Sequence, residues 1–143
     1  MEMALLMTRS DHAISVPVSK LMCCSAFKHP VWFEVTKPIT KKEVTGAIRA
    51  GFFLDRPLNG GQAFLPEGIR TLHIWRVAYL VVNPDPKPIF VDVGIPHMGV
   101  HIDWIVDDGN HRLAAAIFRQ DKTIPASIAG CTRTIREKLG VAA

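Results

Sequence analysis

One stretch of this chain decides its fold: Trp104-Ile-Val-Asp-Asp-Gly-Asn-His-Arg-Leu-Ala-Ala-Ala-Ile117. A β-branched apolar run ends in two acidic residues and a glycine, and an alanine-rich segment with helical spacing follows at once. At the glycine, the spacing of the apolar residues changes from every second position to every third or fourth position. The change predicts a strand over Val100–Val106, a tight turn at Gly109 and a helix from about Asn110 to Arg119.

The start of the expected helix has the chemistry of an anion site. The first backbone N–H groups of a helix have no partner within the helix, and the helix dipole adds a partial positive charge, so phosphates are attracted there. His111 and Arg112 place a titratable ring and a fork-shaped cation in the same turn. The residues Gly109 to Arg112 are therefore a candidate phosphate-binding turn.

Two other interpretations of this turn remain open. In the first, the turn is purely structural: Asp108 or Asn110 caps the helix, and Arg112 pairs with a nearby carboxylate. In the second, the turn contacts the phosphates of a nucleic-acid backbone.

Four residues near the turn have the side chains of a divalent-metal site. On the expected strand, His101, Asp103 and Asp107 share one face, and His111 follows in the turn. Oxygen-rich ligands suit Mg²⁺ or Mn²⁺, and the phosphate oxygens of a nucleotide would complete the coordination shell. The alternative is an edge strand whose polar face only meets solvent.

The segment Asp108-Gly-Asn-His-Arg-Leu-Ala-Ala-Ala116 resembles the G-x-x-R-x-x-A box of the ParB/sulfiredoxin superfamily. The free-standing members of that superfamily, found on mobile elements, often read D-G-x-H-R at this box. Upstream, Pro88–Val93 resembles the strand that precedes the box, and downstream, Thr123–Ile128 resembles the strand that follows the box helix. A weaker similarity joins Ile14–Leu21 to the N-terminal entry strand of the superfamily.

The resemblance implies an α+β fold, with a small mixed sheet and surrounding helices, that holds the phosphates of CTP, ATP or ADP together with Mg²⁺. The phosphate contacts that it implies are Gly109, Asn110, His111 and Arg112. Asp107 and Asp108 are the candidate metal carboxylates, and Asp108 and His111 are the candidate catalytic residues.

The activities implied for a free-standing member, of phage or plasmid kind, are nucleotide hydrolysis, nucleic-acid cleavage or phosphorylation of a small molecule such as free serine. We favour Mg²⁺-dependent hydrolysis of a nucleotide or nucleic acid. The alternative is a non-catalytic accessory protein that binds DNA or a host protein and has a degenerate nucleotide site. Nucleotide is thus the expected partner, DNA is the alternative one, and the sequence leaves the oligomeric state open.

Two branches of the superfamily fit this chain poorly. Sulfiredoxins have a cysteine directly after the box glycine, where this chain has Asn110, so we expect no sulfinic-acid reduction. Partition-type ParB proteins continue into a helix-turn-helix reader and a dimerising tail, whereas only Thr132–Leu139 is expected beyond the sheet.

Capping residues and alternation predict the other elements. Thr40 and Glu43 form a capping box at the start of a helix that runs to about Ala50 and is ended by Gly51. The remaining expected elements are strands at Ile14–Val18, Val31–Val35, Thr71–Val82, Ile89–Val93 and Ile124–Ile128, and a helix at Thr132–Leu139. The three tryptophans, Trp32, Trp75 and Trp104, lie within apolar alternation and are expected in the core.

The length, net charge and cysteine content of the chain limit the class of protein. The chain has 143 residues, which fits one domain, 1–143, with a loose arm at 1–13 and a long loop at 55–68. A loop of this length is either a lid or partner-contact loop or an inert excursion. A formal net charge of +4 is compatible with nucleotide or nucleic-acid partners. Three cysteines without framework spacing favour a reducing cytoplasm, and no apolar run approaches the roughly 20 residues of a membrane span.

Overall fold

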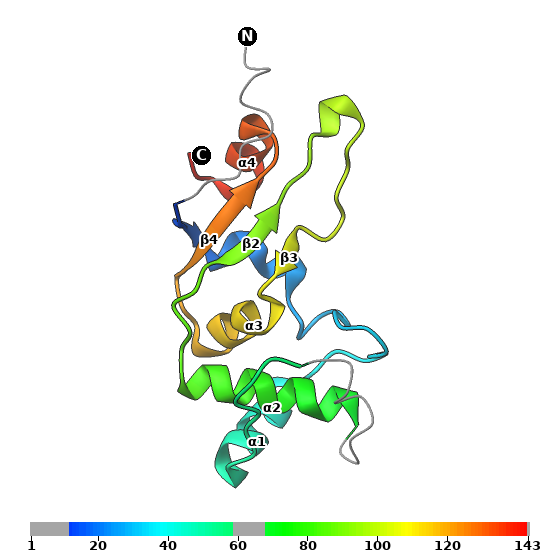
Figure 1. The fold of residues 1–143 in the computed structure, drawn as a ribbon, viewed down its shortest axis with the longest axis vertical. Helices are drawn as coiled ribbons and strands as arrows, with labels where there is room; N and C mark the ends of the chain where they lie inside the picture. The colour runs from blue at the N-terminus through cyan, green and yellow to red at the C-terminus, as the bar shows by residue number, and fades with distance from the viewer. Residues whose placement is uncertain (1–11, 59–67, 143) are drawn as a thin grey trace. The chain divides into compact units, whose positions relative to one another are not determined.

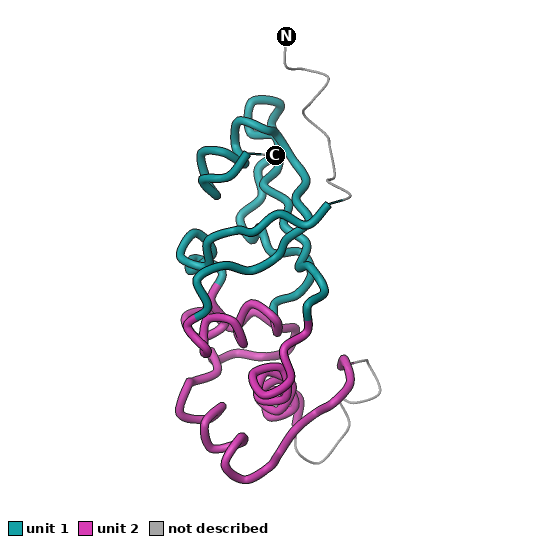
Figure 2. The backbone as a smooth tube through the Cα atoms, turned by 90° about the vertical axis from the view of Figure 1, so that its left-hand side faces the viewer, with its two compact units in different colours: residues 1–24, 86–110, 121–143 teal, residues 25–85, 111–120 magenta. Residues whose placement is uncertain are grey.

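The computed structural model describes residues 12–58 and 68–142. Most of the expected arm at 1–13 and of the loop at 55–68 lies outside these residues. The chain divides into two compact units that interleave in sequence (Figure 2). The sheet unit comprises residues 1–24, 86–110 and 121–143, and the helical unit comprises residues 25–85 and 111–120. A single folding domain stays a prediction.

The sheet unit is built on a mixed sheet of four strands in the order β1-β4-β2-β3 (Figure 1). The strands are β1 Ile14–Pro17, β2 Ile89–Asp92, β3 Val106–Asp108 and β4 Thr123–Ala129. Strand β4 pairs antiparallel with β1 and parallel with β2, and β2 pairs antiparallel with β3. A mixed sheet combined with helices confirms the predicted α+β class.

Short helical segments complete the sheet unit. A 3-10 helix at Val18–Cys24 follows β1 directly, and a second one lies at Pro96–Met98. Helix α4 spans Thr132–Leu139, as predicted, and ends at Gly140, whose φ of +67° is a left-handed conformation that suits glycine.

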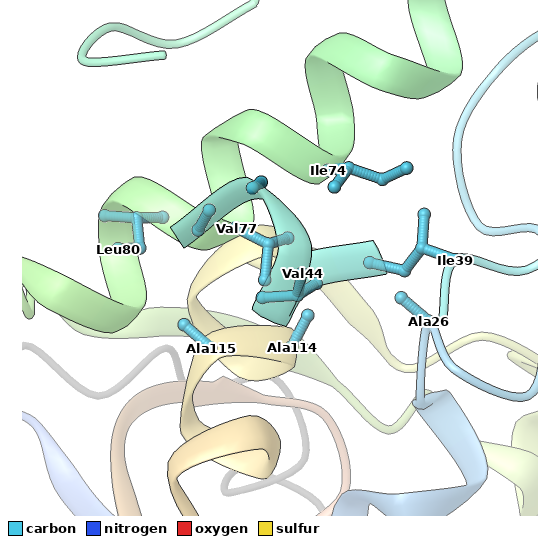
Figure 3. Close-up of a cluster of buried hydrophobic side chains, with 10 residues drawn as sticks. Ala26, Ile39, Val44, Ile74, Val77, Leu80, Ala114 and Ala115 are labelled. Carbon is cyan, nitrogen blue, oxygen red and sulfur yellow. The ribbon is translucent and has the colours of Figure 1, made fainter. Parts of the chain in front are cut away.

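Three helices form the helical unit: α1 Lys41–Ala50, α2 Ile69–Val82 and α3 Asn110–Arg119, which enters this unit at His111. Their apolar faces meet in one buried cluster (Figure 3). Its members are Ala26, Ile39, Val44, Ala47, Ile74, Val77, Ala78, Leu80, Ala114 and Ala115. The alanines contributed by α3 are short, so they allow the helix axes to approach closely.

The start of α1 has the predicted capping box. The Thr40 hydroxyl accepts from the Glu43 backbone N–H at 3.1 Å, and the Thr40 backbone N–H donates to Glu43 Oε1 at 3.1 Å. Arg70 of α2 adds a two-pronged ion pair to the same carboxylate, with Nη1 donating to Oε2 at 2.6 Å. Arg70 also donates to the Pro38 carbonyl at 2.8 Å. The entry to α1 is thereby fixed to α2.

Residues Thr71–Val82, which the alternation predicts as a strand, are helical and belong to α2. The segment is rich in β-branched and aromatic residues, and its apolar residues fit period 2 as well as a helix. Its buried residues are Leu72, His73, Ile74, Val77, Ala78 and Leu80, a set with helical spacing. A length of 14 residues favours a helix over a strand when the two periods compete.

Two other predicted strands are wrong in part or in whole. Residues 31–35 turn instead of extending, and Glu34 adopts a left-handed φ of +63°. Residues 101–105 form no strand: after the Ile95–Val100 bridge the chain returns to β2 at Ile105, whose carbonyl accepts from the Asp92 N–H at 2.8 Å, and the strand pairing begins at Val106. The predicted strand Val100–Val106 is therefore reduced to β3, Val106–Asp108.

Candidate functional site

The decisive stretch has the predicted order of strand, turn and helix, and the helix has the predicted bounds, although the strand is shorter and later than predicted. Strand β3 ends at Asp108, Gly109 turns the chain with a φ of +100°, and α3 begins at Asn110. A Cβ atom at position 109 would lie 2.7 Å from the Cβ of Ile89 in β2. Only glycine fits this turn, because both the backbone angle and the close approach to β2 exclude a side chain.

The side chain of Asn110 holds the turn in place. Its Oδ1 accepts from the indole N–H of Trp104 at 3.1 Å, and its Nδ2 donates to the Val106 carbonyl at 3.2 Å. Both ends of the amide are thus used within the sheet unit. These two hydrogen bonds use Oδ1 and one of the two Nδ2 hydrogens, so the backbone N–H of Asn110 and the second Nδ2 hydrogen are the donors left for an anion at this turn.

His111, the next residue, forms a pair with His73 of α2 in the helical unit. His111 Nε2 lies 2.7 Å from His73 Nδ1, and the two ring planes differ by 16°. The indole of Trp32 stacks on both rings, with centroid distances of 4.4 Å to His73 and 4.6 Å to His111. The two imidazoles therefore lie edge to edge, and the Trp32 indole covers one face of both rings.

Burial keeps both histidines neutral. It lowers the pKa of His73 to about 4, and it lowers the pKa of His111 to about 3, with smaller contributions from the charges of His73, Arg76 and Arg112. A neutral imidazole has one N–H and one lone pair, so one ring of the pair donates and the other accepts. His111 would thus meet an anion as a neutral ring with its Nε2 already occupied.

Two arginines of the helical unit lie within electrostatic range of each other next to His111. Burial lowers the pKa of Arg76 on α2, Asp85 and Tyr79 oppose this, and the charge of Arg112 in the first turn of α3 adds a smaller lowering effect. Arg76 Nη1 donates to the Leu54 carbonyl at 3.3 Å. Both guanidinium groups lie within electrostatic range of His111 near the amino end of α3, where the helix dipole favours an anion, and Arg76 is also within range of the acidic Asp85.

The two predicted metal carboxylates are both exposed. Val106 pairs with Val91 and Asp108 pairs with Phe90, so Asp107 is an extra, bulged residue of β3. A bulge interrupts the alternation of side chains along a strand, which accounts for the exposure of Asp107 and Asp108 together.

The predicted metal cluster is not assembled by the protein alone. His101 and Asp103 are exposed on the irregular segment before β3 and share no strand face with Asp107, because that part of the predicted strand does not form. Within residues 12–58 and 68–142, no three His, Cys, Asp or Glu side chains converge on a metal position. Asp107 and Asp108 still fit Mg²⁺, which commonly takes one or two carboxylates and completes its shell with water and phosphate oxygens.

Sequence reasoning missed His73 and the role of Trp32. Trp32 was expected in the core, but it is only partly buried and covers the histidine pair. A helical interpretation of residues 69–82 would have placed His73 in a stripe with Val77 and Leu80. A histidine within an apolar stripe signals a buried polar group that needs a partner.

Comparison with known proteins gives no relative: the chain matches no protein-family model, no curated protein and no solved structure. Among the helices described, none is long and apolar enough to cross a membrane.

Proposed function

We propose that this protein binds a nucleoside triphosphate, CTP or ATP, by holding its phosphates at the first turn of α3. The observation that carries the proposal is the glycine turn itself: Gly109, with a φ of +100°, ends β3 and starts α3, with Arg112 in the first turn of the helix. The resemblance of Asp108–Ala116 to the superfamily box supports the same ligand and the same residues.

Each residue of the turn has a part in the proposed binding. Gly109 brings the backbone into a conformation that no other residue fits, and the backbone N–H groups of Asn110 and His111, in the first turn of α3, would donate to the phosphates. Arg112 supplies a planar, two-pronged donor, and Arg76 supplies a second positive charge.

We extend the proposal to Mg²⁺-dependent hydrolysis of the nucleotide or of a phosphodiester. Asp107 and Asp108 would hold the Mg²⁺ ion, and the ion would offset the negative charge of the phosphates. Of the two candidate catalytic residues, Asp108 is exposed, and His111 is poorly suited to act as a general base. A general base works best with a pKa near the operating pH, and burial lowers the pKa of His111 to about 3.

Calorimetric titration with matched series of ligands tests the binding proposal. Affinity should rise from cytidine through CMP and CDP to CTP, and likewise along the adenosine series, because the phosphates make the contact. Parallel thermal-shift measurements, with and without Mg²⁺, should show the greatest stabilisation with the triphosphates. Equal affinity for nucleoside and triphosphate, or no binding in either series, would contradict the proposal.

The distribution of charge supports a second candidate function, nucleic-acid binding without catalysis. The helical unit contains ten Lys and Arg residues against five Asp and Glu, whereas the sheet unit contains seven against eight. The helical unit also exposes Phe33 and Phe52, at 87% and 53%, and exposed aromatic rings with nearby cations bind single strands by stacking. Fluorescence anisotropy with a labelled single-stranded oligonucleotide would detect this activity, and Phe33→Ala should weaken it.

A further inference from the structure

Cys23 and Cys24 form a vicinal pair of thiols at the end of the 3-10 helix Val18–Cys24 in the sheet unit. Their sulfur atoms lie 3.9 Å apart. Cys23 is exposed, and Cys24 is buried. The pair therefore has one sulfur that reagents reach directly and a second sulfur close behind it.

The inner sulfur lies beside the segment that leads into β3. Burial, and to a smaller extent the adjacent Cys23, raise the pKa of the Cys24 thiol, while backbone groups of Val106 and Ile105 lower it. The inner thiol is therefore less acidic than an ordinary cysteine, and the exposed Cys23 is the sulfur that a reagent meets first.

The geometry does not favour closure of the pair into a disulfide. Cα atoms of neighbouring residues are about 3.8 Å apart across a trans peptide, whereas disulfides usually join Cα atoms about 4.4–6.8 Å apart. A bond between Cys23 and Cys24 would also require the sulfurs to approach from 3.9 Å to about 2 Å.

The separation of the sulfurs does suit a soft centre held between them. Two thiolates on one tetrahedral zinc ion, each about 2.3 Å from the metal, lie about 3.8 Å apart. Zinc needs four ligands, however, and the described part of the chain offers no cluster of three or more His, Cys, Asp or Glu side chains. A centre that requires only two thiolates fits better, and trivalent arsenic with one organic substituent is such a centre.

We propose that Cys23 and Cys24 form a bidentate site for trivalent organoarsenicals. Each thiol replaces one bond from arsenic to oxygen: two S–H bonds and the As=O group of phenylarsine oxide become two As–S bonds and one water molecule. Arsenic stays trivalent and no oxidant is needed. The proposal does not rest on the nucleotide binding proposed above.

Intact-protein mass spectrometry with phenylarsine oxide tests the proposal. The wild type should gain one phenylarsine group with the loss of two hydrogens. A dithiol should release it, and a monothiol at equal thiol concentration should not. Bound arsenical should protect Cys23 and Cys24 together from alkylation by iodoacetamide.

Single-cysteine variants separate this site from other thiol reactions. Cys23→Ser changes an exposed side chain and should abolish the dithiol-reversible adduct, and Cys24→Ser should do the same. Cys131→Ser, a change at the third cysteine, should leave the adduct intact. An adduct that persists in Cys23→Ser, the absence of any adduct in the wild type, or conversion of the pair to a disulfide under mild diamide treatment before arsenical binds would overturn the proposal.

Discussion

His73 and His111 share a hydrogen bond, with His73 Nδ1 lying 2.7 Å from His111 Nε2 in rings whose planes differ by 16°. One ring donates and the other accepts, so the two outer nitrogens, His73 Nε2 and His111 Nδ1, have opposite hydrogen-bonding character. A group that bonds to one outer nitrogen therefore determines the protonation of the other. Helix α3 thus begins on a fixed pair of neutral imidazoles.

We expect this pair to make folding stability depend on acid. The ordinary histidine pKa of 6.5 applies to the unfolded chain, and in the folded protein burial lowers it to about 4 for His73 and about 3 for His111. Between these pKa values the unfolded chain binds more protons than the folded protein does. The contribution of the pair to the free energy of unfolding is therefore fully present above about pH 6.5 and is lost as the pH decreases toward 4. The expected loss between pH 7.5 and pH 4.5 is about 5 kcal/mol, because each of the two histidines contributes about two pH units at about 1.4 kcal/mol per unit.

Urea denaturation at several pH values measures this effect. His73→Gln should remove much of the pH dependence, and His97→Gln, a change at an exposed histidine, should keep it. A flat profile in the wild type over this range would mean that the histidine pair is not buried as a neutral unit.

Removal of the indole above the pair should raise both pKa values. Trp32 covers His73 and His111, and desolvation is the first cause of their lowered pKa, so Trp32→Ala admits water and favours the charged rings. Nuclear magnetic resonance titration of the histidine ring signals should show both pKa values moving toward 6.5. The matched control is Trp75→Ala, since Trp75 packs on Phe52 instead, and it should leave the histidine signals unchanged.

The sequence predicted the elements around the box well, because each carries local signals. The capping box of Thr40 and Glu43 marks the start of α1, and Gly140 marks the end of α4. The change of apolar period at Gly109 marks the boundary between β3 and α3. Local chemistry decides such boundaries, so they can be inferred without tertiary contacts.

The errors arise where tertiary packing decides. In α2, β-branched residues adopt a helix because its stripe packs on α1 and α3, against their strand propensity. The histidine pair joins residues 38 positions apart, and the indole that covers it comes from a turn that was expected to be a strand. No local pattern brings these three residues together, so the electrostatics of His111 could not be derived from the sequence.

Gly109→Ala should destabilise the protein by about 2–4 kcal/mol, because the φ of +100° strains an L residue and the new methyl group meets Ile89. The matched control is Gly46→Ala inside α1, where a Cβ meets nothing within 4 Å and where alanine should stabilise by about 0.5–1 kcal/mol. Thermal and urea unfolding of both variants give the comparison. Similar stability of the two variants would show that the turn at 109 relaxes.

Arg112 separates phosphate binding from a purely structural turn. If its guanidinium holds phosphate, Arg112→Ala should weaken nucleotide binding by about 1.5–3 kcal/mol, the size of a lost charge-assisted hydrogen bond. Arg112→Lys should recover only part of this loss, because an ammonium keeps the charge without the two-pronged geometry, and affinity should fall as salt rises.

Arg133→Ala is the matched control: Arg133 also lies in the first turn of a helix, is exposed and pairs with Glu137, so its loss should leave nucleotide affinity unchanged. Calorimetry and thermal unfolding on the same samples distinguish the cases. A lower melting temperature in Arg112→Ala with unchanged affinity would assign Arg112 to an internal ion pair and would favour the non-catalytic nucleic-acid-binding function.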